Sequence, residues 1–234
     1  MPNSFILFEP KDIVSGDFYL ITEVTTIIPE SKNHEKLILF SVGDCTGHGV
    51  PGAFMSIIGI QIFNQCIKKA EINTTSSALD FLNTEVYNAV NIHRVGDMVI
   101  RDGMDLALCA FNPRTLQLYY SGAKNPIYIV RNKEVTIIKG DKQPIGSSET
   151  PEPFTQHFFQ LEKGDMLYLF TDGLPDQFGG PKGKKFKYKK FQETLINNSS
   201  DSIDTQKDKL LAEFTEWKGS LEQLDDVCVI GIRI

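Results

Sequence analysis

The chain has 234 residues, of which 41% are hydrophobic and 23% are charged, as is usual for a globular protein with a sizeable core. Its formal net charge of −6 argues against a general nucleic-acid-binding protein, which would carry an excess of basic residues. No stretch of about 18 consecutive apolar residues occurs, so no membrane span is predicted. The N-terminus has neither the basic start nor the long apolar core of a signal peptide, and we expect a cytoplasmic protein.

Four cysteines are spread along the chain, at Cys45, Cys66, Cys109 and Cys228. No CxxC pair and no Cys/His cluster accompanies them, which argues against a zinc site. We therefore expect reduced, mostly buried thiols, as in proteins of a reducing compartment.

In chain order, the first third predicts two strands followed by two helices. Residues 16–24 alternate between apolar and polar types, and residues 35–44 form a nearly continuous apolar run that ends at an aspartate. A glycine-rich turn, DCTGHGVPG at 44–52, comes next. Residues 53–70 and 77–93 then read as helices, the first of them apolar on more than one face.

The middle of the chain is dominated by short strand candidates that turn signals separate. They cover residues 104–112, 117–123, 127–132, 134–140, 155–161 and 165–173. A lysine-rich loop at 179–190 leads to two helical segments, 190–198 and 204–219, and the chain ends in a buried type of strand at 227–234. Strands clustered in the middle and helices in consecutive pairs predict an α+β fold with antiparallel sheets covered by helices.

Three aspartates, Asp44, Asp172 and Asp225, share one context, since each lies at the edge of a strongly apolar strand. Rigid strand ends with turns beside them can bring such side chains together on one rim of a sheet. Their hard oxygen ligands suit Mg²⁺ or Mn²⁺, and two such ions about 3.5–4 Å apart orient a phosphate and activate water. Asp17, at the start of a strand, is a fourth candidate. The alternative is that each aspartate only forms a turn or caps a helix.

Four motifs occur in order along the chain: VSGDFY, SVGDCTGHGVPGAFMS, YLFTDGLPDQF and LDDVCVIGIRI. Together they resemble the metal-dependent protein phosphatase 2C (PP2C) family, in its bacterial branch typified by SpoIIE and RsbU. The resemblance implies one phosphatase domain over residues 1–234, of a kind that is commonly the output end of a longer chain. It also implies a four-layer αββα sandwich and the hydrolysis of phosphoserine or phosphothreonine on a protein with two Mn²⁺ or Mg²⁺ ions.

The resemblance assigns a role to each acidic residue. Asp44 matches the aspartate that bridges the two ions, and Cys45 matches a position that offers its backbone carbonyl to one of them. Asp172 and Asp225 match ligands of the other ion, while Asp17 matches an acidic residue that reaches the first ion, often through water. The implied mechanism is direct attack of a metal-activated water on phosphorus, without a phosphoenzyme.

Two places depart from the wider family. Where its eukaryotic-type members have an arginine that contacts phosphate, this chain has Lys11 and Asp12, so phosphate recognition must differ. Where the wider family often binds a third metal through an aspartate, this chain has Lys124, and a cation there argues against a third ion because like charges repel. We expect Lys124 either to pair with Asp105 or to contact the substrate phosphate.

Three further features have two interpretations each. His48, in the glycine-rich turn, is either a general acid for the leaving oxygen or a hydrogen-bonding residue that stabilises the turn. Residues 182–190 hold six lysines and either steer an acidic or phosphorylated partner or form a solvated loop. The helix at 53–70 either packs in a layer or, by resemblance, carries homodimer or regulatory contacts together with the helix after it.

The sequence therefore predicts a protein serine/threonine phosphatase whose substrate, by resemblance, is a phosphorylated anti-sigma-factor antagonist or a similar signalling protein. Two alternatives are a catalytically silent partner-binding module of the same fold and a phosphoesterase that acts on small molecules. The intact set of aspartates argues against the first alternative. The lack of a nucleotide-cradling motif argues against the second.

Overall fold

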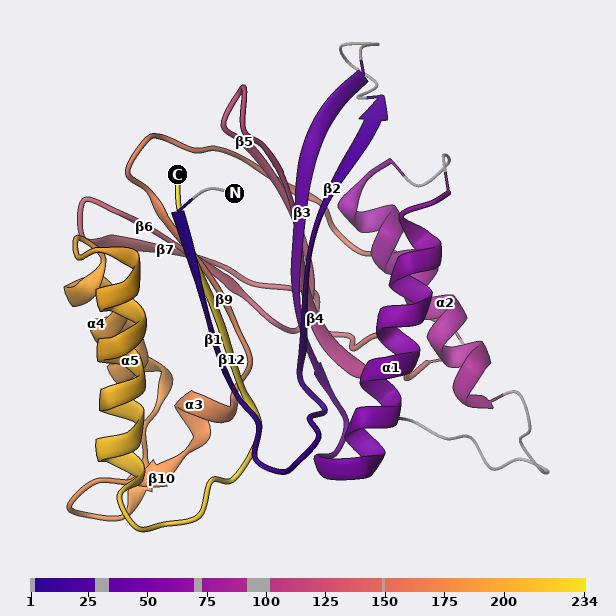
Figure 1. The fold of residues 1–234 in the computed structure, drawn as a ribbon. Helices are drawn as coiled ribbons and strands as arrows, with labels where there is room; N and C mark the ends of the chain where they lie inside the picture. The colour runs from indigo at the N-terminus through magenta and orange to yellow at the C-terminus, as the bar shows by residue number, and fades with distance from the viewer. Residues whose placement is uncertain (1–2, 28–33, 70–72, 92–101, 149) are drawn as a thin grey trace.

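The computed structural model describes residues 3–27, 34–69, 73–91, 102–148 and 150–234. In these residues two five-stranded antiparallel sheets lie face to face, and a pair of helices covers the outer side of each sheet (Figure 1). The prediction of an α+β fold is therefore confirmed, as is the more specific αββα sandwich.

The first sheet has the strand order β1-β12-β9-β6-β7. These strands are β1 (Asn3–Glu9), β12 (Val227–Arg233), β9 (Met166–Phe170), β6 (Ile127–Arg131) and β7 (Glu134–Ile138). β9 is buried along its whole length because helices cover one face of the sheet and the second sheet covers the other. The sequence interpretation missed β1, whose partner β12 lies at the opposite end of the chain. The ring of Phe5 occupies the space that a side chain at Gly231 would need.

The second sheet has the strand order β2-β3-β4-β5-β8. These strands are β2 (Phe18–Ile27), β3 (His34–Cys45), β4 (Met104–Asn112), β5 (Gln117–Ala123) and β8 (His157–Gln160). Alternate residues of β3 face opposite sides, as the period of two requires. Phe40 and Val42 pack between the two sheets, whereas Cys45 packs on the helix side.

The helices form the two outer layers. α1 (Gly49–Cys66) and α2 (Thr75–Asn91) cover the second sheet, and α4 (Tyr188–Asn198) and α5 (Ile203–Lys218) cover the first. α3 (Gly173–Asp176) is a single turn that follows β9. The helix expected at 53–70 begins earlier and ends at Cys66, so Lys68 and Lys69 come after it. Residues 70, 92 and 93, the expected ends of the first two helices, lie outside the described residues.

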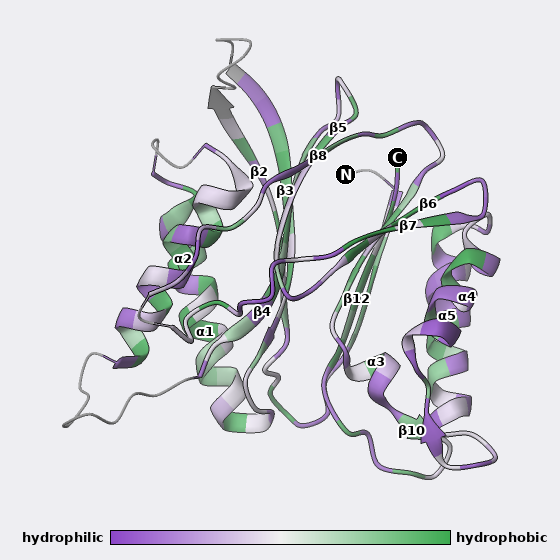
Figure 2. Ribbon diagram, turned by 180° about the vertical axis from the view of Figure 1, so that it is seen from behind, coloured by the Kyte–Doolittle hydropathy of each residue, from purple (hydrophilic) through white to green (hydrophobic). Residues whose placement is uncertain are grey.

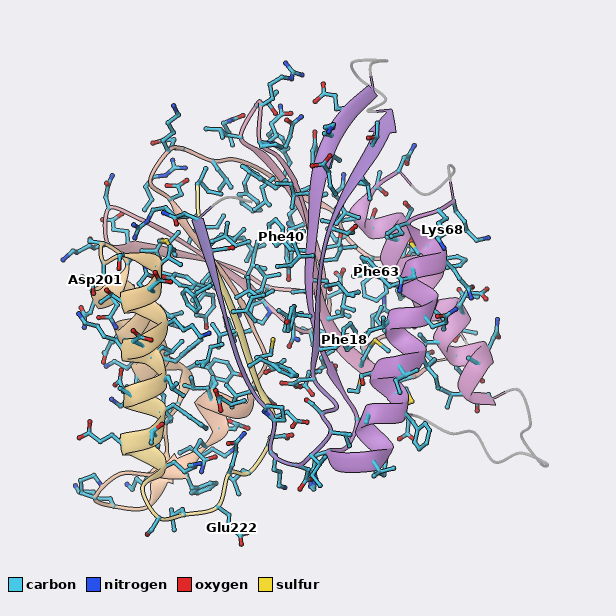
Figure 3. All side chains as sticks on the ribbon, viewed as in Figure 1. Phe18, Phe40, Phe63, Lys68, Asp201 and Glu222 are labelled. Atoms are coloured by element: carbon cyan, nitrogen blue, oxygen red, sulfur yellow. The ribbon has the colours of Figure 1, made fainter. Side chains whose placement is uncertain are left out.

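Three apolar clusters hold the layers together, one between the sheets and one under each helix pair. Figure 3 shows Phe40 between the sheets and Phe63 between α1 and the second sheet. Burial of each such side chain stabilises the fold by about 1.5–3 kcal/mol. In Figure 2 the strands are coloured largely as hydrophobic, whereas α4 and α5 carry both hydrophilic and hydrophobic residues. All four cysteines are free and buried, as expected.

The lysine-rich segment is more ordered than the predicted loop. Within it, β10 (Phe178–Gly179) pairs with β11 (Lys184–Lys185) as a small hairpin, and α4 begins directly afterwards. Among the described residues, no helix has the length and apolar character that crossing a membrane requires.

Candidate metal centre

The four candidate aspartates come from strand ends at one end of the sandwich. Asp17 directly precedes β2 and Asp44 is the next-to-last residue of β3, and these antiparallel neighbours bring the start of one strand to the end of the other. Asp172 follows β9 and Asp225 lies just before β12, which are neighbours in the other sheet. The strand ends that carry these four residues lie on one rim of the sandwich, next to α3 and the β1–β2 loop (Figure 1).

The carboxylates on this rim interact electrostatically. Burial and the nearby charges of Asp17, Asp172 and Asp225 raise the pKa of Asp44 to about 9. Burial, together with the surrounding carboxylates, raises the pKa of Asp17 to about 8 and that of Asp172 to about 6. Like charges that crowd in a poorly solvated place favour the protonated form, and a divalent cation among them reverses that preference.

The donor chemistry of the rim suits Mg²⁺ or Mn²⁺, since it is made of carboxylate and carbonyl oxygens. Burial and nearby Asp44 raise the pKa of the Cys45 thiol, so the sulfur stays protonated and only its backbone carbonyl is suited to a hard ion. In the described part of the chain, no group of three His, Cys, Asp or Glu side chains is spaced to hold a metal ion by itself. Because Mg²⁺ keeps several water ligands, the rim needs to supply only part of its coordination shell.

Thr171 holds Asp17 in place. Its hydroxyl donates a 2.6 Å hydrogen bond to Oδ2 of Asp17, and its oxygen accepts a 2.9 Å hydrogen bond from the Cys228 backbone N–H. Both Thr171 and Asp17 are buried, so this bond is shielded from water. Our sequence interpretation did not single out Thr171, although it is the threonine of the FTDG motif.

Asp226 fastens the β1–β2 loop to the rim. Its Oδ1 accepts a 2.8 Å hydrogen bond from the Lys11 backbone N–H, and its Oδ2 accepts one of the same length from the Gly16 backbone N–H. The side chain is buried, and both carboxylate oxygens are engaged. The sequence interpretation assigned a role only to Asp225, the first aspartate of the pair.

The glycine-rich turn allows an unusually close backbone approach. Gly47 and Gly49 have φ angles of +84° and +64°, which glycine adopts without strain. A Cβ atom on Gly52 would lie 2.1 Å from the Gly47 carbonyl oxygen, and one on Gly16 would lie 2.6 Å from the same oxygen. The absence of these side chains brings α1, the turn and the β1–β2 loop together beside Asp44.

Comparison with known proteins identifies the family. Residues 34–234 match the sequence model of the family described as Stage II sporulation protein E (SpoIIE). The chain belongs to the SpoIIE family. It is thus an enzyme, a protein serine/threonine phosphatase of the PP2C type. No curated protein sequence matches the chain.

Solved structures share the fold of this SpoIIE-family chain. The SiaA-PP2C domain of Pseudomonas aeruginosa is 28% identical with a TM-score of 0.83, and the match covers 99% of this chain and 85% of that one. The PP2C phosphatase domain of Bacillus subtilis SpoIIE, with a fragment of its regulatory domain, is 18% identical with a TM-score of 0.75. That match covers 100% of this chain and 62% of that one. The RsbU and RsbW domains of a Mycobacterium tuberculosis protein are 17% identical with a TM-score of 0.73, and that match covers 99% of this chain and 60% of that one.

In this SpoIIE-family chain, His48 is exposed and lies against the β1–β2 loop. Its Nε2 is 3.0 Å from Nζ of Lys11, and its Nδ1 is 3.3 Å from Oδ2 of Asp12. These contacts match the interpretation in which His48 stabilises the turn by hydrogen bonds. Its role as a general acid stays a prediction.

Lys124 stands beside the SpoIIE-family rim through Asp105. Asp105 on β4 lies directly opposite Asp44 on β3, and Nζ of Lys124 is 3.2 Å from Oδ1 of Asp105. The expected pairing of Lys124 with Asp105 is therefore confirmed. Its side chain is 47% exposed, so the ammonium is also open to solvent, and contact with the substrate phosphate stays a prediction.

Proposed function

We propose that this SpoIIE-family domain, which we take to span residues 1–234, hydrolyses phosphoserine and phosphothreonine on a protein with two Mn²⁺ or Mg²⁺ ions. The observation that carries the proposal is the gathering of Asp17, Asp44, Asp172 and Asp225 on one rim, with the pKa of the first three raised. Ionised carboxylates in such a place need a counter-charge, and divalent cations supply it most simply.

In this proposal Asp44 would hold both ions, Asp17 and the Cys45 carbonyl would hold one of them, and Asp172 and Asp225 would hold the other. When bound, the ions supply Lewis-acid activation of water and offset the charge of the phosphoryl oxygens. This assignment is supported by the strand-end positions of all four aspartates.

The chain's own side chains prepare the site in two further ways. Thr171 restricts Asp17 to one orientation through its 2.6 Å hydrogen bond. His48 is our candidate donor of a proton to the leaving oxygen of the substrate. Its Nε2 faces the Lys11 ammonium at 3.0 Å, so the imidazole has to release Lys11 before Nε2 donates a proton to substrate.

As the physiological substrate we propose a phosphorylated protein of the anti-sigma-factor antagonist type, on the strength of the motifs shared with this branch of the family. As a second partner we propose another copy of the chain. Val50, Phe54 and Ile57 are 61%, 64% and 62% exposed on α1, at the spacing that places them on one helix face. An apolar stripe of this kind is typical of an interface. The four free cysteines support a cytoplasmic location.

Hydrolysis of para-nitrophenyl phosphate with Mn²⁺ tests the activity directly. We expect turnover with Mn²⁺, no turnover with EDTA, and a fall of at least about 100-fold in kcat/KM for Asp44→Ala, since removal of a metal-bridging carboxylate removes both ions' common ligand. A phosphothreonine peptide should be a substrate under the same conditions. Turnover that survives both EDTA and Asp44→Ala would contradict the proposal.

The partner-binding alternative is favoured by the same exposed face of α1 and is tested separately. Light scattering during size-exclusion chromatography should show a dimer that Phe54→Ser dissociates. A binding module predicts this result without any metal-dependent turnover of peptide or para-nitrophenyl phosphate. A small-molecule phosphoesterase predicts turnover of para-nitrophenyl phosphate with no turnover of phosphopeptides.

A further inference from the structure

The β10–α4 segment, residues 178–188, is fixed to the turn that carries Asp172. The backbone N–H of Lys187 donates a 2.7 Å hydrogen bond to the Pro175 carbonyl, and the backbone N–H of Phe186 donates a 2.9 Å hydrogen bond to the Gln177 carbonyl. Pro175 belongs to α3, which begins directly after Asp172. The segment therefore holds a defined position relative to the acidic rim.

The same segment is also anchored to α5 through Trp217. The ring of Phe186 packs edge-on against the Trp217 ring at a centroid distance of 5.3 Å. The Gly180 N–H donates a 2.7 Å hydrogen bond to the Trp217 carbonyl, and a Cβ atom on Gly179 would lie 1.8 Å from that oxygen. Anchoring on two sides makes this segment a rigid support, which a binding edge requires.

Tyr188 projects from this support at the rim. Its ring lies 6.4 Å from the ring of Phe170, the residue two before Asp172, and its side chain is 42% exposed. The residue before it, Lys187, has a φ of +73°, a strained conformation for a side chain with a Cβ atom. Such strain persists where the surroundings impose it, and here it sets the direction in which α4 starts.

The Tyr188 hydroxyl is a donor that has no acceptor among the described residues. Burial and the nearby Asp172 and Asp176 carboxylates raise the pKa of the Tyr188 phenol, as does the charge of Asp44. The hydroxyl thus stays protonated at neutral pH and lies within electrostatic reach of the aspartate rim. A protonated phenol offers an O–H group to an incoming anion.

Lys185 adds a cation to the same edge. Its Nζ lies 2.9 Å from Oδ2 of Asp176, with 45% and 39% of the two side chains exposed. The charge of Lys185 also opposes the rise in the pKa of Asp172, so the ammonium acts on that carboxylate electrostatically. An exposed ion pair of this kind is weak and can exchange its partner for a phosphate.

The arginines of the described residues are engaged elsewhere. Arg114 pairs with Glu35, Arg131 pairs with Asp165 and Glu162, and Arg233 donates to the backbone carbonyls of Ser199 and Asp201. Among the described residues, the protein donors for phosphoryl oxygens at the rim are therefore side chains other than arginine.

We propose that Tyr188 and Lys185 form the phosphate-binding edge of the site, the Tyr188 hydroxyl donating a hydrogen bond to a non-bridging phosphoryl oxygen and the Lys185 ammonium offsetting its charge. This inference rests on the proposed phosphatase function and assigns two further substrate-binding residues to it. It explains how a chain with Lys11 and Asp12 in place of a phosphate-contacting arginine still orients its substrate.

Steady-state kinetics of Tyr188→Phe and Lys185→Ala test the edge, with para-nitrophenyl phosphate and a synthetic phosphothreonine peptide as substrates. Each variant should raise KM for both substrates, and Ki for inorganic phosphate, by about 3- to 10-fold, while kcat changes less than about twofold. Calorimetric titration should show weaker binding of inorganic phosphate and an unchanged Mn²⁺ affinity. Tyr188→Phe keeps the ring on Phe170, so folding is preserved.

Matched control variants separate this edge from general surface effects. Tyr119→Phe removes a phenol hydroxyl from β5, and Lys209→Ala removes an exposed lysine whose Nζ lies 2.7 Å from Asp201. Both should keep wild-type kinetics. If Tyr188→Phe and Lys185→Ala also match an active wild type, or change only the Mn²⁺ affinity, the edge is overturned and the phosphatase function stands. If the wild type hydrolyses neither substrate, the proposed function fails and the edge fails with it.

Discussion

The Thr171 hydroxyl donates a 2.6 Å hydrogen bond to the Asp17 carboxylate, although the two residues adjoin strands of different sheets. Thr171 follows β9 and Asp17 precedes β2, so the bond crosses between the sheets at the acidic rim. Because the Cys228 backbone N–H donates to the same threonine oxygen, the hydroxyl proton is directed at Asp17. One side chain thereby couples the packing of the sheets to the orientation of a candidate ligand.

Thr171→Val should lower the Mn²⁺ affinity and reduce kcat/KM by about 10-fold or more. A hydrogen bond to a charged group contributes about 1.5–3 kcal/mol, and valine keeps the shape of threonine while removing the donor. Calorimetric titration with Mn²⁺ and hydrolysis of para-nitrophenyl phosphate measure the two effects. Thr171→Ser keeps the hydroxyl and serves as the control. Equal Mn²⁺ affinities for the valine and serine variants would argue against this role of Thr171.

The metal-free protein should lose stability as pH rises. The pKa values of Asp44, Asp17 and Asp172 in the folded state are about 9, about 8 and about 6, all above the ordinary value of 3.8. Stability from their protonation is fully present below about 3.8 and is lost as pH rises through these folded-state values. With EDTA, we expect Tm to fall between pH 5 and pH 9, by about 2–4 °C for each kcal/mol of stability that is lost in a chain of this size.

Asp44→Asn provides the control for this pH dependence. It removes the carboxylate that interacts with Asp17, Asp172 and Asp225, so the fall in Tm should become shallower and the metal-free variant should be more stable than wild type at pH 9. Mn²⁺ should raise the Tm of wild type more at pH 8 than at pH 5, since its ligands bind only when deprotonated. A wild-type Tm that is insensitive to both pH and Mn²⁺ would speak against a cation site on this rim.

Asp226→Asn should destabilise the protein by about 2–4 kcal/mol, since it places an amide group against one of two backbone N–H donors in a buried position. Urea unfolding of the metal-free protein measures this cost. Asp225→Asn is the matched control, because its Oδ1 can still accept the hydrogen bond from the Asp226 backbone N–H. That control should unfold like wild type while losing most of its metal-dependent turnover. An Asp226→Asn variant that is as stable as wild type would show that these two hydrogen bonds do not stabilise the β1–β2 loop.

Gly52→Ala should cost about 1–3 kcal/mol of stability and reduce activity. Its Cβ atom would lie 2.1 Å from the Gly47 carbonyl oxygen and 2.9 Å from Cα of Gly16, and backbone on both sides cannot yield without moving the turn. The Cβ atom of Gly59→Ala in the same helix would come within 2.6 Å of Cε of the flexible Met104 side chain and would make an ordinary 3.5 Å contact with the Phe18 ring. Alanine has a higher helix propensity than glycine, and this gain of about 1 kcal/mol should offset most of the free-energy cost of the contact with Met104. Equal Tm values for the two variants would contradict this account.

Local patterns account for most of the strands and helices. β3, β9 and β12 have long apolar runs because both of their faces are buried. Such runs can be recognised in the sequence without knowledge of the neighbouring strands. β1 was missed because its burial depends on pairing with β12. The order of residues 178–187 was missed for a similar reason, since it comes from Trp217 on α5 and from the α3 turn.

The sequence by itself determined the α+β class, the family and the acidic positions Asp17, Asp44, Asp172 and Asp225, because motifs and hydrophobic periods are local properties of the chain. Only the tertiary structure decided what surrounds those positions. Thr171 reaches Asp17 across 154 residues, and Asp226 reaches Gly16 across 210. Such contacts follow from the pairing of distant strands, so their partners cannot be read from spacing along the chain. The placement of Lys185 and Tyr188 at the rim is decided in the same way.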